Sequence, residues 1–278
     1  EHQIASGIDG LLVCGSTGEA SSLTDDEYRQ VIETAVATAS GRVPVMAGTG
    51  TNSTATTIAR TRLAHSLGVD AALVVAPWYN RPTQAGLIAH MEAVAAATPL
   101  PIVLYNVPGR TGTDLLPDTA IRLSRTPGIA GLKEASGDVG RVACIASRAV
   151  SGFAVFSGDD ALTLPMMSVG ACGVISVTSN VAPATVSALT AAALRGDLAA
   201  ARDLQLELVD LNRALFLESN PIPVKVAAAL LGFGTGEVRM PLTPASAATI
   251  EAINRSLRTV DETTAALRVT RPEPRPTI

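Results

Sequence analysis

Aromatic residues, charged residues and cysteines are all scarce in this chain, and each shortage excludes a class of protein. Aromatic residues make up 3% and charged residues 17% of the 278 residues, whereas hydrophobic residues make up 47%. This aliphatic composition is typical of a folded globular chain and argues against intrinsic disorder. The formal net charge is -4 and no basic stripe is present, so nucleic acid is not an expected partner.

Metal sites, disulfides and membrane spans are also not expected. The three cysteines lie far apart without a Cys-x-x-Cys motif, which argues against a disulfide framework or a zinc site and fits a reducing cytoplasm. The three histidines form no His-Glu-x-x-His motif. No uncharged apolar stretch is long enough for a membrane span. We therefore expect a cytoplasmic protein without a metal.

What the chain does contain is a series of short apolar segments at roughly regular intervals. Each is rich in Val, Ile, Leu or Gly and is bounded by turn residues, a pattern that predicts buried parallel strands. The segments are Ile8–Gly15, Val43–Gly48, Ala72–Pro77, Pro101–Asn106, Ile129–Lys133, Phe153–Gly158 and Cys172–Thr178. Helical patterns separate them, and strand–helix alternation is typical of a parallel sheet.

Several helix boundaries can be predicted from capping residues. Thr24 and Glu27 form a capping box at the start of one helix, and Asn52 is expected to cap the next. Further helices are expected over residues 83–97, 115–124 and about 244–257. Asp159 and Asp160 are expected to cap the helix that follows them rather than bind a metal.

These elements predict an α/β protein: a (β/α)8 TIM barrel that lacks its first strand in this sequence and carries a C-terminal helical extension. Residues 1–182 would form the barrel (strands 2–8), residues 183–262 helices packed on it, and residues 263–278 a disordered tail. The chain opens as the end of a helix that runs into a strand, so we expect an upstream segment. The alternative is an open doubly wound sheet, but no Gly-x-Gly-x-x-Gly motif follows the first strand.

Lys133 is the clearest candidate for chemistry, because it lies inside an apolar strand. Alternation along the strand places Ile129, Gly131 and Lys133 on one face. If this face points into the barrel, burial lowers the pKa of the ammonium group, and the neutral amine can attack a ketone to form an imine. The alternative is a strand-end lysine that reaches solvent or pairs with Glu134.

Other polar residues follow the strands at the same end, where barrel enzymes place their catalytic groups. Tyr105 either relays protons beside a forming imine or only packs. Ser16 and Thr17 lie in a glycine-flanked turn that either holds a carboxylate or is an ordinary turn. Arg110 lies in a loop rich in Gly and Thr and suits bidentate carboxylate binding. Tyr79 marks either the site or a subunit interface.

Five motifs together resemble the dihydrodipicolinate synthase / N-acetylneuraminate lyase superfamily, over about residues 4–244. In order, they are Gly15-Ser16-Thr17-Gly18-Glu19, Tyr105-Asn106-Val107-Pro108-Gly109-Arg110-Thr111-Gly112, Gly131-Leu132-Lys133-Glu134, Gly173-Val174-Ile175-Ser176-Val177-Thr178 and Asn220-Pro221-Ile222-Pro223-Val224-Lys225. The second and fifth are similar to the dihydrodipicolinate synthases. This resemblance implies condensation of pyruvate with aspartate-4-semialdehyde in diaminopimelate and lysine biosynthesis, without a cofactor, by a homotetramer of tight dimers.

The resemblance also implies four catalytic residues. Lys133 would form the Schiff base with pyruvate, and Tyr105 would donate and accept protons. Ser16 and Tyr79 would complete a hydroxyl relay, with Tyr79 supplied by the neighbouring subunit. Many synthases have Thr where this chain has Ser16, and the hydroxyl is kept.

Four substrate-binding residues are implied in the same way. Thr17 would bind the pyruvate carboxylate, and Arg110 would hold the semialdehyde carboxylate. Gly158 and Ile175 would line the pocket through their backbone carbonyls.

Two alternative functions remain open at this point. The first is another Schiff-base enzyme, an N-acetylneuraminate lyase or a 2-keto-3-deoxy sugar-acid aldolase, which shares the lysine and the tyrosine. Arg110 argues against it, because a long polyhydroxylated substrate needs hydroxyl and amide partners rather than a cation. The second is a non-catalytic barrel that acts as a scaffold, and the set Lys133, Tyr105, Ser16 and Tyr79 argues against it.

Regulation by lysine is expected to be weak or absent. Lysine-inhibited members of the family bind lysine at the tight-dimer interface through two histidines, a glutamate, a tyrosine and an asparagine. This chain keeps Asn52, but it has Asp25, Tyr28, Thr56 and Trp78 at the other matching positions. Thr56 in place of the glutamate removes the carboxylate that would pair with the lysine ammonium.

Overall fold

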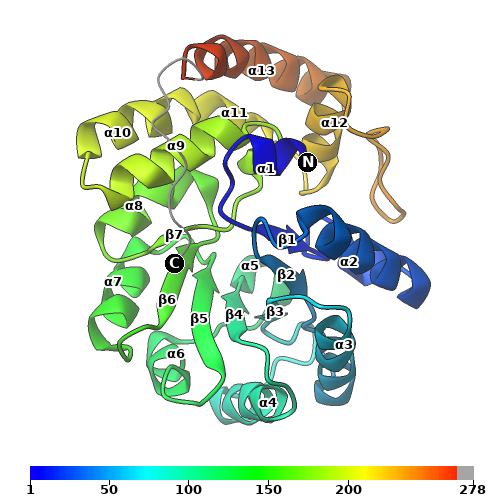
Figure 1. The fold of residues 1–278 in the computed structure, drawn as a ribbon, viewed down its shortest axis with the longest axis vertical. Coiled ribbons are helices and arrows are strands. Elements are labelled where there is room, and N and C mark those ends of the chain that lie inside the picture. Colours follow the sequence, from blue (N-terminus) through cyan, green and yellow to red (C-terminus); the bar gives the residue numbers. More distant parts are fainter. Residues whose placement is uncertain (268–278) are drawn as a thin grey trace.

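The computed structural model describes the backbone of residues 1–267 and the side chains of residues 1–260. Its centre is a single sheet of seven parallel strands in the order β1 to β7 (Figure 1). The strands are β1 (Leu11–Val13), β2 (Val45–Gly48), β3 (Ala71–Val75), β4 (Ile102–Asn106), β5 (Ile129–Glu134), β6 (Ala154–Ser157) and β7 (Gly173–Val174). All seven predicted strands are confirmed, and β1 and β7 form the two edges of the sheet.

Helices follow the strands and cover the outside of the curled sheet (Figure 1). They are α1 (His2–Ala5), α2 (Asp25–Ala39), α3 (Thr54–Ser66), α4 (Gln84–Ala96), α5 (Pro108–Thr111), α6 (Pro117–Leu123), α7 (Val139–Arg148) and α8 (Thr163–Ser168), with short 3-10 turns η1 (Ala20–Ser22), η2 (Asp160–Leu162) and η3 (Thr178–Asn180). This strand–helix alternation around one parallel sheet confirms the predicted α/β barrel architecture.

The C-terminal helices form a second layer beside the barrel, at the top of Figure 1. They are α9 (Pro183–Leu194), α10 (Leu198–Glu207), α11 (Val209–Ala214), α12 (Ile222–Leu230) and α13 (Ala247–Leu267). They share their own apolar core, in which Leu189 of α9, Leu211 of α11 and Ile253 of α13 are buried. Helix α13 is ten residues longer than the predicted end at 257 and enters the predicted tail, whose remainder, residues 268–278, lies outside the described residues.

Side-chain caps begin several of the helices, with two corrections to the predicted caps. Thr24 and Glu27 form the predicted capping box of α2, and Thr83 caps α4. The prediction for Asn52 was wrong: α3 begins one residue later, and the Ser53 side chain accepts the hydrogen bond from Thr56 N. Asp159 caps η2 as expected, but Asp160 does not cap a helix, because it is buried and bonds to residues after β7.

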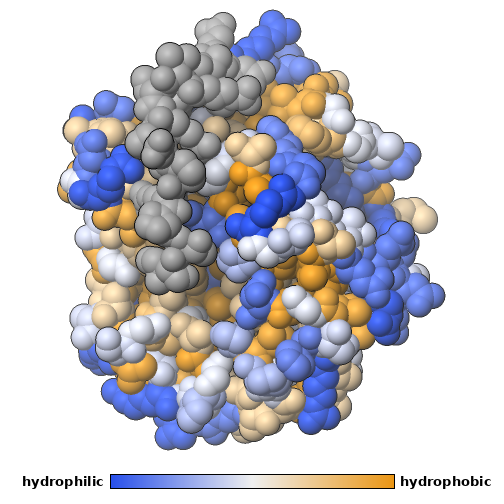
Figure 2. Space-filling view, in the orientation of Figure 1, coloured by the Kyte–Doolittle hydropathy of each residue, from blue (hydrophilic) through white to orange (hydrophobic). Residues whose placement is uncertain are grey.

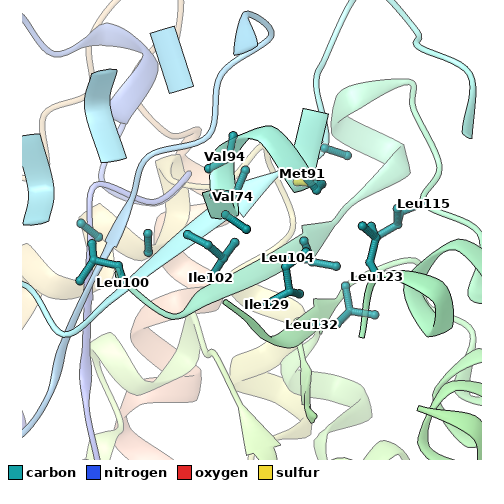
Figure 3. Packing of buried hydrophobic residues seen from close by; sticks show 14 of the residues in the cluster. Val74, Met91, Val94, Leu100, Ile102, Leu104, Leu115, Leu123, Ile129 and Leu132 are labelled. Atoms are coloured by element: carbon teal, nitrogen blue, oxygen red, sulfur yellow. The ribbon is translucent and has the colours of Figure 1, made fainter. Parts of the chain in front are cut away.

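The two faces of the sheet carry different cores. The outward face packs against the helices, where Ile102 and Leu104 of β4 contact the cluster that includes Met91 of α4 (Figure 3). The inward face forms a small separate cluster around Leu73, Val103 and Tyr105. Alternation of side chains along each strand accounts for this separation.

The prediction that Ile129 shares a face with Lys133 was wrong. Ile129 belongs to the outward cluster with Ile102 (Figure 3). The register of β4 and β5 shifts there, because Ile102 lies opposite Ile129 but Val103 lies opposite Gly131. The extra residue, Ala130, interrupts the alternation in the way that a β-bulge does.

The outer surface is mixed, with hydrophilic residues over α2 and along the lower edge and hydrophobic residues nearer the centre of the same view (Figure 2). Within residues 1–267, no helix has the length and apolar character that crossing a membrane requires.

Candidate active site

Lys133 is buried at the carboxyl end of β5, with 7% of its surface exposed. Its Nζ lies 4.6 Å from the centre of the Tyr105 ring on the adjacent strand β4, in register with it. Burial lowers the pKa of the Lys133 ammonium from 10.5 to about 8, assisted by the Arg110 cation and opposed by Asp160. The alternative of a solvent-exposed lysine therefore fails, and the amine is available as a nucleophile close to neutral pH.

Glu134, the other partner considered for Lys133, faces away from it. Its side chain is fully buried and accepts hydrogen bonds from Asn106 Nδ2 at 3.2 Å and from Ser136 N at 2.8 Å. Arg141 lies 3.6 Å from Glu134 and also pairs with Asp114 at 2.9 Å. This network fixes the ends of β4 and β5 side by side, which keeps Tyr105 and Lys133 adjacent.

Tyr105 is buried beside the lysine and is linked to the turn after β1. Burial raises the pKa of the Tyr105 phenol, whereas the nearby Arg110 cation and a hydrogen bond from the Ser16 side chain act in the opposite direction. The structure therefore brings Ser16, Tyr105 and Lys133 together, as predicted, with the phenol protonated at neutral pH.

Gly158 lies directly against the lysine. A Cβ atom at this position would come within 3.0 Å of Lys133 Cε and within 2.6 Å of Ala135 Cβ. Gly158 N also donates a hydrogen bond of 2.7 Å to Glu134 O. Ile175 packs on the inward cluster that contains Tyr105, so both predicted pocket residues lie beside the Lys133–Tyr105 pair.

Asn220, for which its motif predicted no role, connects two of the predicted binding residues. Its side-chain amide donates to Thr17 Oγ1 at 3.0 Å, and its backbone carbonyl accepts from Arg110 at 3.2 Å. Lys225 of α12 binds Glu19 in the same turn as Thr17. The first and fifth motifs are therefore joined in space, although about 200 residues separate Thr17 and Asn220 in the sequence.

Tyr79 is the one predicted catalytic residue that the single chain does not bring to the site. Its side chain is 88% exposed, and the residue adopts a left-handed φ of 73°. Its N–H donates a hydrogen bond of 3.2 Å to Thr111 O, which fixes the backbone while the ring projects outward.

Asp160 was missed as a site residue because the adjacent Asp159 supplied a simple explanation as a helix cap. Its carboxylate is buried and acts electrostatically on Lys133. Among the side chains that the structure describes, those of residues 1–260, no cluster of three or more His, Cys, Asp or Glu is arranged to hold a metal ion.

Comparison with known proteins agrees with this geometry. The model of the dihydrodipicolinate synthetase family matches residues 1–260. A 4-hydroxy-tetrahydrodipicolinate synthase of Nitratidesulfovibrio vulgaris (strain DP4) is 49% identical over 257 residues, which cover 92% of this chain and 86% of that protein.

Two solved structures superpose on most of the chain. A chloride-inhibited dihydrodipicolinate synthase from Acinetobacter baumannii, complexed with pyruvate, has a TM-score of 0.91 and 45% identity, covering 94% of this chain and 89% of that one. A monomeric dihydrodipicolinate synthase variant has a TM-score of 0.92 and 40% identity, covering 94% and 88%. Because the family model matches residues 1–260 and the sequence identity to a named synthase is 49%, and because the site geometry agrees, this chain belongs to the dihydrodipicolinate synthetase family.

Proposed function

We propose that this protein condenses pyruvate with aspartate-4-semialdehyde to give 4-hydroxy-tetrahydrodipicolinate, a step of diaminopimelate and lysine biosynthesis. The observation that carries the proposal is the buried Lys133 next to Tyr105, with a pKa of about 8, in a chain 49% identical to a named synthase. A lysine of this kind forms imines with 2-keto acids, and no metal or organic cofactor is needed for that reaction.

In the first stage, the neutral amine of Lys133 attacks the keto carbon of pyruvate. The carbinolamine then loses its oxygen as water, and a proton must be delivered to that oxygen. Tyr105 is placed for this delivery, because its phenol is protonated at neutral pH and is within reach of the lysine. Ser16 hydrogen-bonds to the phenol and can pass the proton onward.

Two residues would hold the carboxylates of the two substrates. The Asn220 amide donates to the Thr17 hydroxyl at 3.0 Å, and the Thr17 hydroxyl donates to Asn220 Oδ1 at a longer 3.4 Å, a bond that it can exchange for one to the pyruvate carboxylate. Arg110 is exposed at the carboxyl end of the strands and suits the carboxylate of the semialdehyde. Gly158 and Ile175 would line the space between them through their backbone carbonyls.

The exposed Tyr79 side chain supports a subunit interface at the site. We infer that Tyr79 enters the site of a neighbouring subunit and completes the hydroxyl relay, in a homotetramer built from tight dimers. A monomeric variant exists among the related structures, so mixing an inactive Lys133→Ala chain with an inactive Tyr79→Phe chain tests the inference. Recovery of activity would support sites shared between subunits, and its absence would contradict them.

Lysine feedback is proposed to be weak or absent. Asp25 and Thr56 line a surface cavity of about 330 Å³ between α2 and α3, together with Arg29 and Arg60. Asp26 also lines this cavity, so its two carboxylates are matched by two guanidinium groups, and Arg60 lies over the Tyr28 ring at 5.1 Å. The cavity therefore offers no excess of negative charge to a lysine ammonium. Calorimetry that detected tight lysine binding would contradict this proposal.

The activity itself is tested with purified protein, pyruvate and aspartate-4-semialdehyde, using formation of the cyclic product as the readout. Arg110→Ala is expected to raise the KM for the semialdehyde by about tenfold or more, since a charged hydrogen bond contributes ~1.5–3 kcal/mol, and to leave imine formation with pyruvate nearly intact. Turnover of N-acetylneuraminate or a 2-keto-3-deoxy sugar acid, without condensation of the semialdehyde, would contradict the proposal.

A further inference from the structure

A buried carboxylate, Asp160, follows closely after Gly158, the residue that lies against the lysine. Asp160 begins η2, two residues after Gly158, and is 4% exposed. It accepts hydrogen bonds from the Ser176 hydroxyl, from Val177 N at 2.8 Å and from Thr178 N at 3.2 Å. Burial raises the pKa of the Asp160 carboxyl, and these three donors, together with the Lys133 cation, act in the opposite direction and favour the charged carboxylate.

The surrounding helices hold the backbone of Asp160 and one of the residues that bind its carboxylate. Gln205 of α10 donates to Asp160 O at 3.1 Å and accepts from Leu164 N at 3.0 Å. The Thr178 hydroxyl donates to Asn212 Oδ1 of α11 at 2.7 Å. The carboxylate is therefore tied to both β6 and β7 ends and cannot rotate toward solvent without breaking several hydrogen bonds.

Three groups act on the charge of Lys133 from the elements around it. Asp160 of η2 is the anion, Arg110 of α5 is a cation, and the Tyr105 ring of β4 faces the Nζ atom. Within residues 1–260, Lys133 has no ion pair with a carboxylate at direct contact distance. The anion thus acts through the protein interior, where the low dielectric strengthens its effect.

We propose that Asp160 is a positioning residue of the reaction, whose fixed negative charge stabilises the cation that Lys133 becomes when it forms an imine with a 2-keto acid. This inference rests on the proposed role of Lys133. In the step concerned, the amine, the ketone and one proton give an iminium ion and water. The C–N bond forms, the C–O bond breaks, and the oxygen leaves as water.

The proposal predicts a specific pH dependence of the stability of the imine, which a variant with a merely distorted site would not show. The ammonium and the iminium ion both carry their positive charge at Nζ, so Asp160 stabilises the two about equally. Removal of its charge therefore leaves imine formation from the ammonium unchanged at low pH. At high pH, where imine formation starts from the neutral amine, the same removal weakens the imine.

Asp160→Asn removes the charge and keeps the shape. The amide oxygen can accept from Val177 N and Thr178 N, and the amide nitrogen can donate to the Ser176 hydroxyl oxygen. Asp159→Asn is the matched control, because it makes the same charge change one residue earlier, where the side chain only caps η2 through Ala161 N. The imine dissociation constant for pyruvate is measured by borohydride quenching at about pH 6 and about pH 9.5.

For Asp160→Asn we expect an imine about tenfold weaker at the higher pH and unchanged at the lower pH. The rate of imine formation, which depends on the neutral amine, should begin to rise about one pH unit lower than in the wild type. Asp159→Asn should match the wild type at both values. Identical behaviour of the two variants, or an equal loss at both pH values, would overturn the role of Asp160. A wild-type protein without an adduct at Lys133 would instead overturn the proposed function.

If Asp160→Asn does not fold, Asp160→Ser carries the test. Serine also removes the charge, and its hydroxyl can accept one of the hydrogen bonds that the carboxylate accepts. A weaker imine at the higher pH and an unchanged imine at the lower pH would support the proposal. An imine as strong as that of the wild type at both pH values would overturn it.

Discussion

The space at Gly158 gives the sharpest structural prediction for catalysis. In Gly158→Ala, the new methyl group would lie 2.6 Å from Ala135 Cβ, 3.0 Å from Lys133 Cε and 3.1 Å from Glu134 O. The first and third of these contacts are with atoms that cannot move alone, so the strand ends or the lysine must shift. Overpacking of this kind destabilises by about 1–3 kcal/mol, and a misplacement of about 1 Å at a reacting group lowers the rate by about 100-fold.

We therefore expect Gly158→Ala to fold, to lose a few degrees of melting temperature, and to lose about 100-fold in kcat/KM for pyruvate. Gly173→Ala is the matched control, since the nearest atom to its new methyl group would be Phe156 Cδ1 at an ordinary 3.9 Å. The assays are thermal unfolding and steady-state kinetics for both variants. Wild-type kinetics in a folded Gly158→Ala protein would refute the claim that the backbone at Gly158 sets the position of Lys133.

Two further predictions concern stability. Because the pKa of Lys133 is about 8 when folded and 10.5 ordinarily, the unfolded chain binds more protons between these values, and the wild-type protein gains stability as the pH rises through them. Lys133→Met removes this dependence. Its free energy of unfolding relative to the wild type, measured in urea, should therefore fall by about 3 kcal/mol between about pH 8 and pH 10.5. A difference in the free energy of unfolding that stays constant with pH would contradict the burial of Lys133 as a neutral amine. Arg141→Met leaves the buried Glu134 without its cation and should cost about 3 kcal/mol, whereas Arg122→Ala, which breaks an exposed ion pair, should cost less than about 1 kcal/mol. Equal costs would contradict the assigned role of the Glu134 network.

The sequence predicted the strands well because each is a short apolar run between turn residues. The same regularity located Lys133 at a strand end, where its burial follows from the inward direction of its side chain. The alternation rule failed at Ile129, because one extra residue in β5 reverses the faces and nothing in the local composition marks it.

The contacts that hold the site together could not be predicted from local patterns. Asn220 joins Thr17 and Arg110 only because α12 packs beside the end of β1. An aspartate before a helix usually caps it, whereas the partners of the Asp160 carboxylate are Ser176, Val177 and Thr178, which follow the next strand. Tyr79 is the reverse case. The family resemblance predicted a catalytic residue at this position, but in the single chain its side chain is exposed to solvent.

The role of Lys133 as the nucleophile is tested by borohydride trapping with pyruvate followed by peptide mass spectrometry. We expect a reduced pyruvate adduct on the peptide that contains Lys133 and on neither Lys225 nor the N-terminal amine, and the rate of adduct formation should rise as the pH passes through about 8. A folded protein that forms no adduct, or forms it at another amine, would contradict this role.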